Sequence, residues 1–156
     1  LANSMKDAES VLFLGRHVGF PVALEGALKL KEIAYLHAEG FAAGELKHGP
    51  IALIEEGQPV FVIVPSPRGR DSLHSKVVSN IQEIRARGAI TIVIAEEGDT
   101  AVEDYANHVI RIPKAPTLMQ PLLATVPLQI FAAHVAKSKG FDVDQPRNLA
   151  KSVTVE

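Results

Sequence analysis

The sequence has no cysteine among its 156 residues. That absence excludes a disulfide framework and catalysis by a thiolate, and it predicts a cytoplasmic protein. Residues 1–10 lack the basic stretch and the following apolar stretch of a signal peptide. The longest apolar runs are of strand length or are interrupted by proline, glutamine or histidine, so we predict no membrane-spanning segment.

The chain also lacks an excess of charge of either sign. Its 16 Lys and Arg residues are interspersed with 18 Asp and Glu residues, and the net charge is −2. No basic stripe interleaved with aromatic residues is present, which argues against a nucleic-acid partner. With 47% apolar and 22% charged residues, the composition is typical of one globular domain with its own core. Because the chain starts without methionine, we expect it to be part of a longer protein.

Short apolar runs alternate with helical patterns along the chain. The runs at residues 10–15 (SVLFLG), 60–64 and 89–95 predict buried parallel strands, and a weaker run lies at 109–112. Residues 21–36, 70–87 and 116–139 are predicted as helices. Strands alternating with helices indicate an α/β fold, with a parallel sheet flanked by helices on both faces and right-handed crossovers. An irregular tail follows Gly140.

The ionisable groups of residues 23–50 make this segment the candidate site. Ligands of such sheets bind outside the carboxyl ends of the strands, and this segment follows the first strand. On a helix, Glu25, Lys29 and Glu32 share one narrow stripe. One interpretation is an exposed ladder of weak ion pairs. The other is a carboxylate and lysine in a cleft, which is an arrangement that tunes a general base.

Histidines contribute one further candidate and one false lead. His48, just before the Gly49-Pro50 turn, has a side chain suited to acid–base chemistry near neutral pH, although an exposed loop histidine is the commoner case. His37 and Glu39 match half of a zinc deaminase signature, but the cysteines that the signature requires are absent. The six histidines include no i, i+4 pair, so we predict no metal site and no cofactor.

Two long motifs resemble one enzyme family. ALEGALKLKEIAYLHAEGFAAGELKHGP at residues 23–50 and DQPRNLAKSVTVE at 144–156 are similar to the isomerase domain of the glutamine–fructose-6-phosphate aminotransferases. The resemblance implies two sugar isomerase (SIS) domains, each a three-layer αβα sandwich, of which residues 1–140 are the second and residues 141–156 a catalytic tail. That family converts fructose 6-phosphate and glutamine into glucosamine 6-phosphate and glutamate, with ammonia from an N-terminal glutaminase domain.

The resemblance also implies residue roles. Glu32 is expected to be the base that moves a proton between C1 and C2, with Lys29 assisting proton transfer, and His48 is expected to open the sugar ring from a neighbouring subunit. Lys151 is expected to form a Schiff base with the open-chain ketose. Such a lysine must be partly neutral, which requires burial or a nearby cation, whereas a solvated tail lysine is the alternative. The further substrate contacts expected are Glu25, Arg147 and Ala150.

Parts of the family's pattern are missing from this chain. The turn after the first strand reads GRHVGFP, so the Ser/Thr-rich loop that holds the sugar phosphate is expected in the upstream SIS domain. We therefore expect a sugar-phosphate site that is half complete, a homodimer, and the upstream SIS and glutaminase domains as partners, with low turnover of this chain alone. Two alternatives stay open: a non-catalytic module that senses sugar phosphates, and a dimerisation core built on the apolar residues 118–135.

Overall fold

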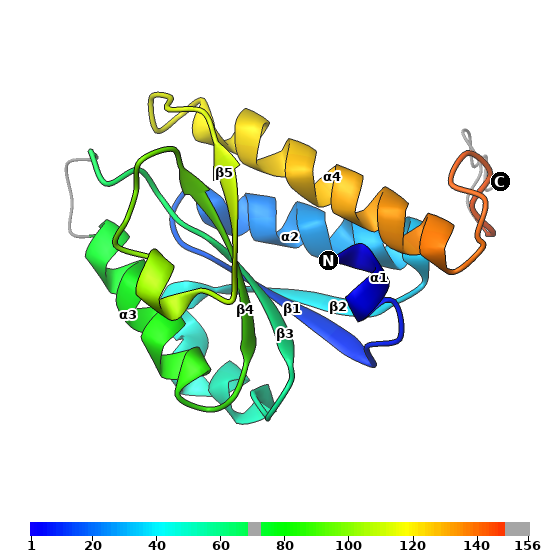
Figure 1. The fold of residues 1–156 in the computed structure, drawn as a ribbon, viewed down its shortest axis with the longest axis horizontal. Helices are drawn as coiled ribbons and strands as arrows, with labels where there is room; N and C mark the ends of the chain where they lie inside the picture. The colour runs from blue at the N-terminus through cyan, green and yellow to red at the C-terminus, as the bar shows by residue number, and fades with distance from the viewer. Residues whose placement is uncertain (69–72, 149–156) are drawn as a thin grey trace, which may run out of the picture.

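The computed structural model describes residues 1–68 and 73–148. Within these residues, five parallel strands form one sheet in the order β2-β1-β3-β4-β5 (Figure 1). The strands are β1 (Ser10–Gly15), β2 (His37–Ala42), β3 (Pro59–Ile63), β4 (Ile90–Glu96) and β5 (His108–Ile112). β3 is the central strand, and β1 pairs with β2 on one side and with β3 on the other, so the direction of winding reverses at β1.

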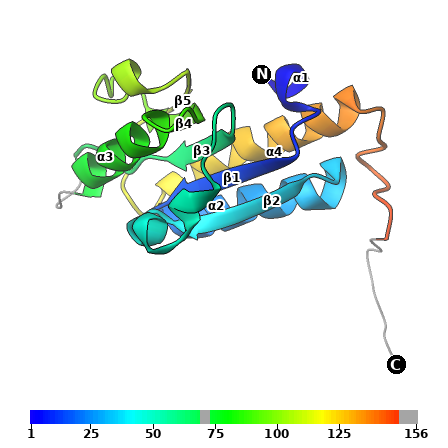
Figure 2. The ribbon, with the colours of Figure 1, turned by 90° about the horizontal axis from the view of Figure 1, so that it is seen from below.

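Helices cover both faces of the sheet, which confirms the predicted αβα sandwich. The α-helices are α1 (Ala2–Met5), α2 (Gly19–Lys29), α3 (Leu73–Arg85) and α4 (Gln120–Ser138). A π-helical turn, η1 (Leu30–Ala34), continues α2, and the short 3-10 turns are η2 (Ala43–His48), η3 (Pro50–Leu53) and η4 (Glu103–Tyr105). Figures 1 and 2 show α2 and α4 together on one face and α3 on the other.

The alternation of side chains along each strand explains the two core layers. In β1, Phe13 points to the layer of α2 and α4, while Leu12 and Leu14 point to the layer of α3. The Phe13 and Phe61 rings stack with centroids 5.0 Å apart, and Phe131 of α4 packs on Phe61 at 4.7 Å. Every residue of β3 is buried, as expected for a central parallel strand.

The sequence did not predict the edge strand β2. Its sequence, HAEGFA, is rich in alanine, glycine and charge, and these residues have low strand propensity. The strand forms because its backbone pairs with β1 over its whole length, from His37 opposite Ser10 to Ala42 opposite Gly15. His37 and Glu39, the half match to a zinc signature, are exposed residues of this strand.

The other predicted elements are confirmed with small shifts at their ends. The predicted helix at residues 21–36 begins two residues earlier, as α2, and changes to the π-helical η1 after Lys29. After α4, residues 139–148 form turns and bends, as expected for an irregular tail. None of the helices in the described ranges is both long and apolar enough to cross a membrane.

Candidate active site

A cleft of ≈ 530 Å³ lies where α2 and η1 end and β2 begins. It is lined by residues of the π-helical turn, the start of β2 and the tail: Lys31, Glu32, Tyr35, Leu36, His37, Arg147 and Asn148. Two of these, Glu32 and Arg147, were predicted from opposite ends of the sequence. The fold therefore brings the two motifs that carry the family resemblance to one place.

The cleft lies at the amino ends of the strands, so the prediction of a site at their carboxyl ends is wrong for Glu32. His37 is the first residue of β2 and pairs with Ser10, the first residue of β1. The reason is the direction of α2. It starts beyond the carboxyl end of β1 and has 11 residues. At 1.5 Å per residue it runs back by ~16 Å, from the carboxyl ends of the strands to their amino ends.

Lys29 joins the two glutamates of the predicted stripe. Its Nζ lies 2.5 Å from Glu32 Oε2 and 3.5 Å from Glu25 Oε1. The Lys29, Glu32 and Glu25 side chains are 26%, 28% and 34% exposed, so the stripe is partly buried. The hydrogen bond to Glu32 raises the pKa of Lys29 above its ordinary value; partial burial opposes this shift, and the charge of Glu25 adds to it.

Glu32 lies on the π-helical turn, which sequence periodicity does not reveal. Such turns are rare and occur often at functional sites. The turn ends at Tyr35, whose φ of 54° places a bulky residue in the left-handed region, with its N–H donating to the Leu30 carbonyl. A residue of this kind in that conformation is uncommon, and surrounding contacts must hold it there.

The tail contacts the cleft through Arg147. Its backbone N–H donates to Tyr35 Oη at 2.8 Å, and its guanidinium lies 4.1 Å from the centre of the Tyr35 ring. Figures 1 and 2 show the segment after α4 returning to the end of α2. Lys151 and Ala150 lie outside the described residues.

His48 does not reach the cleft of its own chain. It ends η2, is 71% exposed, and its Nδ1 lies 2.7 Å from Glu45 Oε2. η2 belongs to the opposite face of the sheet, because Leu46 packs in the core layer of α3 and Lys47 pairs with Glu83 of α3 at 2.8 Å. Within one chain, the sheet therefore separates His48 from Glu32.

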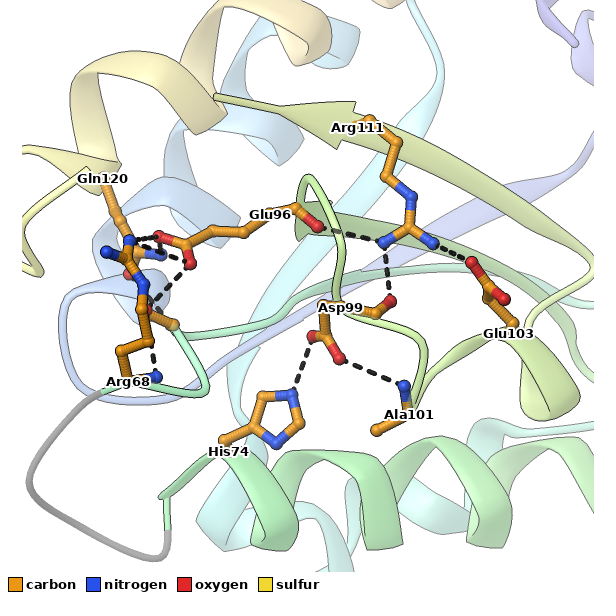
Figure 3. Close-up of polar contacts among 9 residues, drawn as sticks. Arg68, His74, Glu96, Asp99, Ala101, Glu103, Arg111 and Gln120 are labelled. Atoms are coloured by element: carbon orange, nitrogen blue, oxygen red, sulfur yellow. Dashed lines mark hydrogen bonds and ion pairs between the residues drawn. The ribbon is translucent and has the colours of Figure 1, made fainter. Parts of the chain in front are cut away.

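The carboxyl ends of the strands carry a polar cluster that sequence reasoning missed (Figure 3). Glu96 ends β4 and is only 2% exposed. It accepts hydrogen bonds from Ser66 Oγ at 2.9 Å, Gln120 Nε2 at 3.1 Å, Arg68 Nη2 at 3.1 Å and the Ala115 N–H at 3.2 Å. Burial disfavours its charged form, but the bonds from Ser66, Arg68 and Ala115 outweigh burial and lower the pKa of Glu96. Its place directly after the apolar run at residues 89–95 was an available signal in the sequence.

A second part of this cluster stabilises the loop after β4. His74 Nε2 of α3 lies 2.7 Å from Asp99 Oδ2, and the Asp99 Oδ1 accepts the Ala101 N–H at 3.2 Å. Arg111 of β5 donates to the backbone carbonyls of Glu96 and Asp99 at 3.0 and 2.7 Å. These polar groups form their hydrogen bonds with one another, which indicates a structural role. In the described part of the chain, no group of three acidic or histidine side chains is arranged to hold a metal ion.

Relatives from several bacteria match the chain closely. It is 91% identical over 156 residues to the glutamine–fructose-6-phosphate aminotransferase (isomerizing) of Corynebacterium diphtheriae and 70% identical to that of Mycobacterium tuberculosis. In both comparisons the whole chain is matched, and it spans 25% of the relative's length. The chain therefore corresponds to about a quarter of each of these proteins.

Solved structures share the fold. The C-terminal domain of glucosamine-fructose-6-phosphate aminotransferase from Francisella tularensis superimposes with a TM-score of 0.81 and 42% identity, over 92% of this chain and 40% of that one. A glucosamine-6-phosphate deaminase from Thermotoga maritima matches with a TM-score of 0.70 and 26% identity, over 99% and 45% of the two chains. The family model described as the SIS domain matches residues 4–138. This chain belongs to the SIS domain family.

Proposed function

We propose that this chain is the second SIS domain of a cytoplasmic glutamine–fructose-6-phosphate aminotransferase, and that it carries the isomerase chemistry on fructose 6-phosphate. Residues 1–140 form the domain and residues 141–156 its catalytic tail. The observation that carries the proposal is the Lys29–Glu32 pair, whose glutamate lies on a π-helical turn and lines a cleft together with Arg147 of the tail. The relatives bear this enzyme's name.

Glu32 has the chemistry of the isomerase base. Its carboxylate takes a proton from C1 of the open-chain ketose and returns it to C2, which gives the aldose. Negative charge develops on the sugar oxygens while the proton is on Glu32. Lys29 stays protonated, because the hydrogen bond to Glu32 and the charge of Glu25 outweigh burial and raise its pKa. A fixed cation beside these oxygens stabilises the transition state more than the ground state.

The tail prepares the amination step in this proposal. Lys151 attacks C2 of the ketose as a neutral amine, and loss of water gives an imine; ammonia from the glutaminase domain then adds to C2 and releases Lys151. A nearby cation favours the neutral form of a lysine, and Arg147, which lines the Glu32 cleft, provides such a charge four residues before Lys151. Glu25, Arg147 and Ala150 would contact the bound sugar.

His48 would act on the ring oxygen of a substrate held by another subunit. The support is its separation from Glu32 by the sheet, together with its exposure. A homodimer would bring the two residues together, with each chain completing the other's site. The exposed apolar residues of α4, among them Leu122, Val126 and Ile130, would favour self-association.

The first test is conversion of fructose 6-phosphate to glucose 6-phosphate without glutamine. We would measure it with this chain alone and with the upstream SIS domain of its relatives attached. Glu32→Gln should abolish conversion, because the amide cannot accept the proton, whereas Glu39→Gln on the exposed face of β2 should not. Equal conversion by the parent and Glu32→Gln would refute the assignment. Sugar-phosphate binding without conversion by any of the proteins would favour a sensing module.

A second test addresses the shared site. In a homodimer of either single variant, Glu32→Gln or His48→Asn, both sites lack one of the two residues. A mixed dimer has one site with both changes and one site with neither. Random mixing of equal amounts should therefore restore about a quarter of the parent activity, since half of the dimers are mixed and each has one intact site. No recovery in exchanged mixtures would show that both residues serve one chain's site, which the geometry of a single chain opposes.

A further inference from the structure

Tyr35 contacts the tail at two points that are six residues apart in the sequence. Its ring packs on Phe141 with centroids 4.8 Å apart, at the point where the chain leaves α4. Its hydroxyl oxygen accepts the Arg147 N–H at 2.8 Å, and its ring lies beneath the Arg147 guanidinium. We call this set of contacts the Tyr35 clasp.

The clasp and the proposed base belong to the same turn. Glu32 lies within η1, and the Tyr35 N–H closes that turn on the Leu30 carbonyl. The position of the Tyr35 ring is therefore tied to the backbone that carries Glu32. A tail fastened to Tyr35 is held at a set distance from Glu32, even though the two segments are more than a hundred residues apart in the sequence.

The left-handed backbone of Tyr35 supports a specific role for its side chain. Glycine and asparagine adopt this conformation at little cost, and a tyrosine does so at a larger one. The conformation turns the chain sharply from η1 into β2, with Leu36 buried behind it. A glycine would make the same turn but would offer the tail neither an aromatic face nor an acceptor oxygen.

We propose that Tyr35 is a positioning residue that holds Arg147 at the Glu32 cleft through its hydroxyl and its ring. The inference deepens the proposed function and depends on it for the roles of Glu32 and Arg147. Arg147 lines that cleft and is one of the expected substrate contacts, and small errors of position are costly in catalysis.

The test compares Tyr35→Phe with Tyr105→Phe in the full chain. Tyr105 lies on η4 and packs against the other core layer, so its substitution is a matched control. Loss of the hydroxyl should speed hydrogen exchange of the Arg147 amide about five- to tenfold. Tyr35→Leu, which also removes the stacking, should in addition raise trypsin cleavage after Arg147. The Tyr105 variant should show neither change.

Activity separates positioning from simple stabilisation. Tyr35→Phe should lower kcat for fructose 6-phosphate conversion about threefold or more with KM changed less than about twofold, because the substrate still binds but Arg147 no longer holds it in place beside Glu32. Unchanged exchange at Arg147 in both Tyr35 variants would overturn the clasp, whatever the activity. If the exchange rises while Glu32→Gln retains full conversion, the clasp stands and the proposed function fails.

Discussion

Replacing Glu96 with glutamine changes the most buried charged group at the carboxyl ends of the strands. The carboxylate is 2% exposed and accepts hydrogen bonds from Ser66 Oγ, Gln120 Nε2, the Ala115 N–H and Arg68. A glutamine of nearly the same shape keeps one acceptor oxygen. Its other terminal atom is an amide nitrogen, which would face donors. The substitution therefore removes charge and leaves at least one buried donor without an acceptor.

The size of the effect follows from these bonds. A hydrogen bond to a charged acceptor contributes ~1 kcal/mol more than a neutral one. Three of the donors are buried or half-buried groups, and weakening their bonds lowers the unfolding free energy. Glutamine also removes the cost of burying a charge, which offsets part of this loss. The net loss of unfolding free energy is about 2–3 kcal/mol. The Arg68 side chain is 57% exposed, so solvent screens its ion pair and we add little for it. In a chain of 156 residues the loss corresponds to roughly 5–10 °C in Tm.

The same substitution predicts a pH dependence. The hydrogen bonds to Glu96 outweigh burial and lower its folded-state pKa below the ordinary value of 4.5. Its contribution to stability is therefore complete above pH 4.5 and is lost as pH falls through the folded-state pKa. The stability difference between the parent and Glu96→Gln should be constant near neutral pH and should shrink in acid.

Urea unfolding followed by circular dichroism measures this difference at pH 7 and at several acid pH values. Glu97→Gln is the matched control, since Glu97 is the next residue and is exposed. We expect the control to match the parent. A Glu96→Gln variant as stable as Glu97→Gln at pH 7 would refute the reasoning, and so would a difference that is undiminished in acid.

Two further predictions concern α2 and its end. Gly26→Ala should lower the unfolding free energy measured in urea by about 1–2 kcal/mol, although alanine has the better helix propensity, because the new Cβ would lie 2.8 Å from Leu128 Cδ1. Gly44→Ala is the control. Its Cβ would meet mainly the flexible end of an arginine side chain, so it should lower the unfolding free energy less. Lys29→Met should cost about 0.5–1 kcal/mol at pH 7. Because the hydrogen bond to Glu32 raises the folded-state pKa of Lys29, that difference should fade as pH rises above 10.5, and a difference undiminished above that pH would contradict this reasoning.

The apolar runs of the sequence were sufficient to predict β1, β3 and β4, because a strand buried on both faces needs apolar side chains at every position. The pairing of Glu25 with Lys29 was also predictable from α-helical spacing, whereas the π-helical turn that carries Glu32 was not. β2 was not, because its polar residues form a strand only where β1 offers a partner. The local sequence pattern predicts a helix or strand that is stabilised by its own side chains. It does not predict a strand that is stabilised by pairing with a neighbour.

The site needed the tertiary structure. The length and direction of α2 place Glu32 at the amino ends of the strands, and the sheet places His48 on the other face. The burial of Glu96 depends on donors 19 to 30 residues away in the sequence, and the clasp joins Tyr35 to Arg147 across 112 residues. The sequence by itself determined which residue types are present and how they repeat along each element. Only the folded chain decided which of them meet, because that depends on crossovers and packing between segments far apart in the sequence.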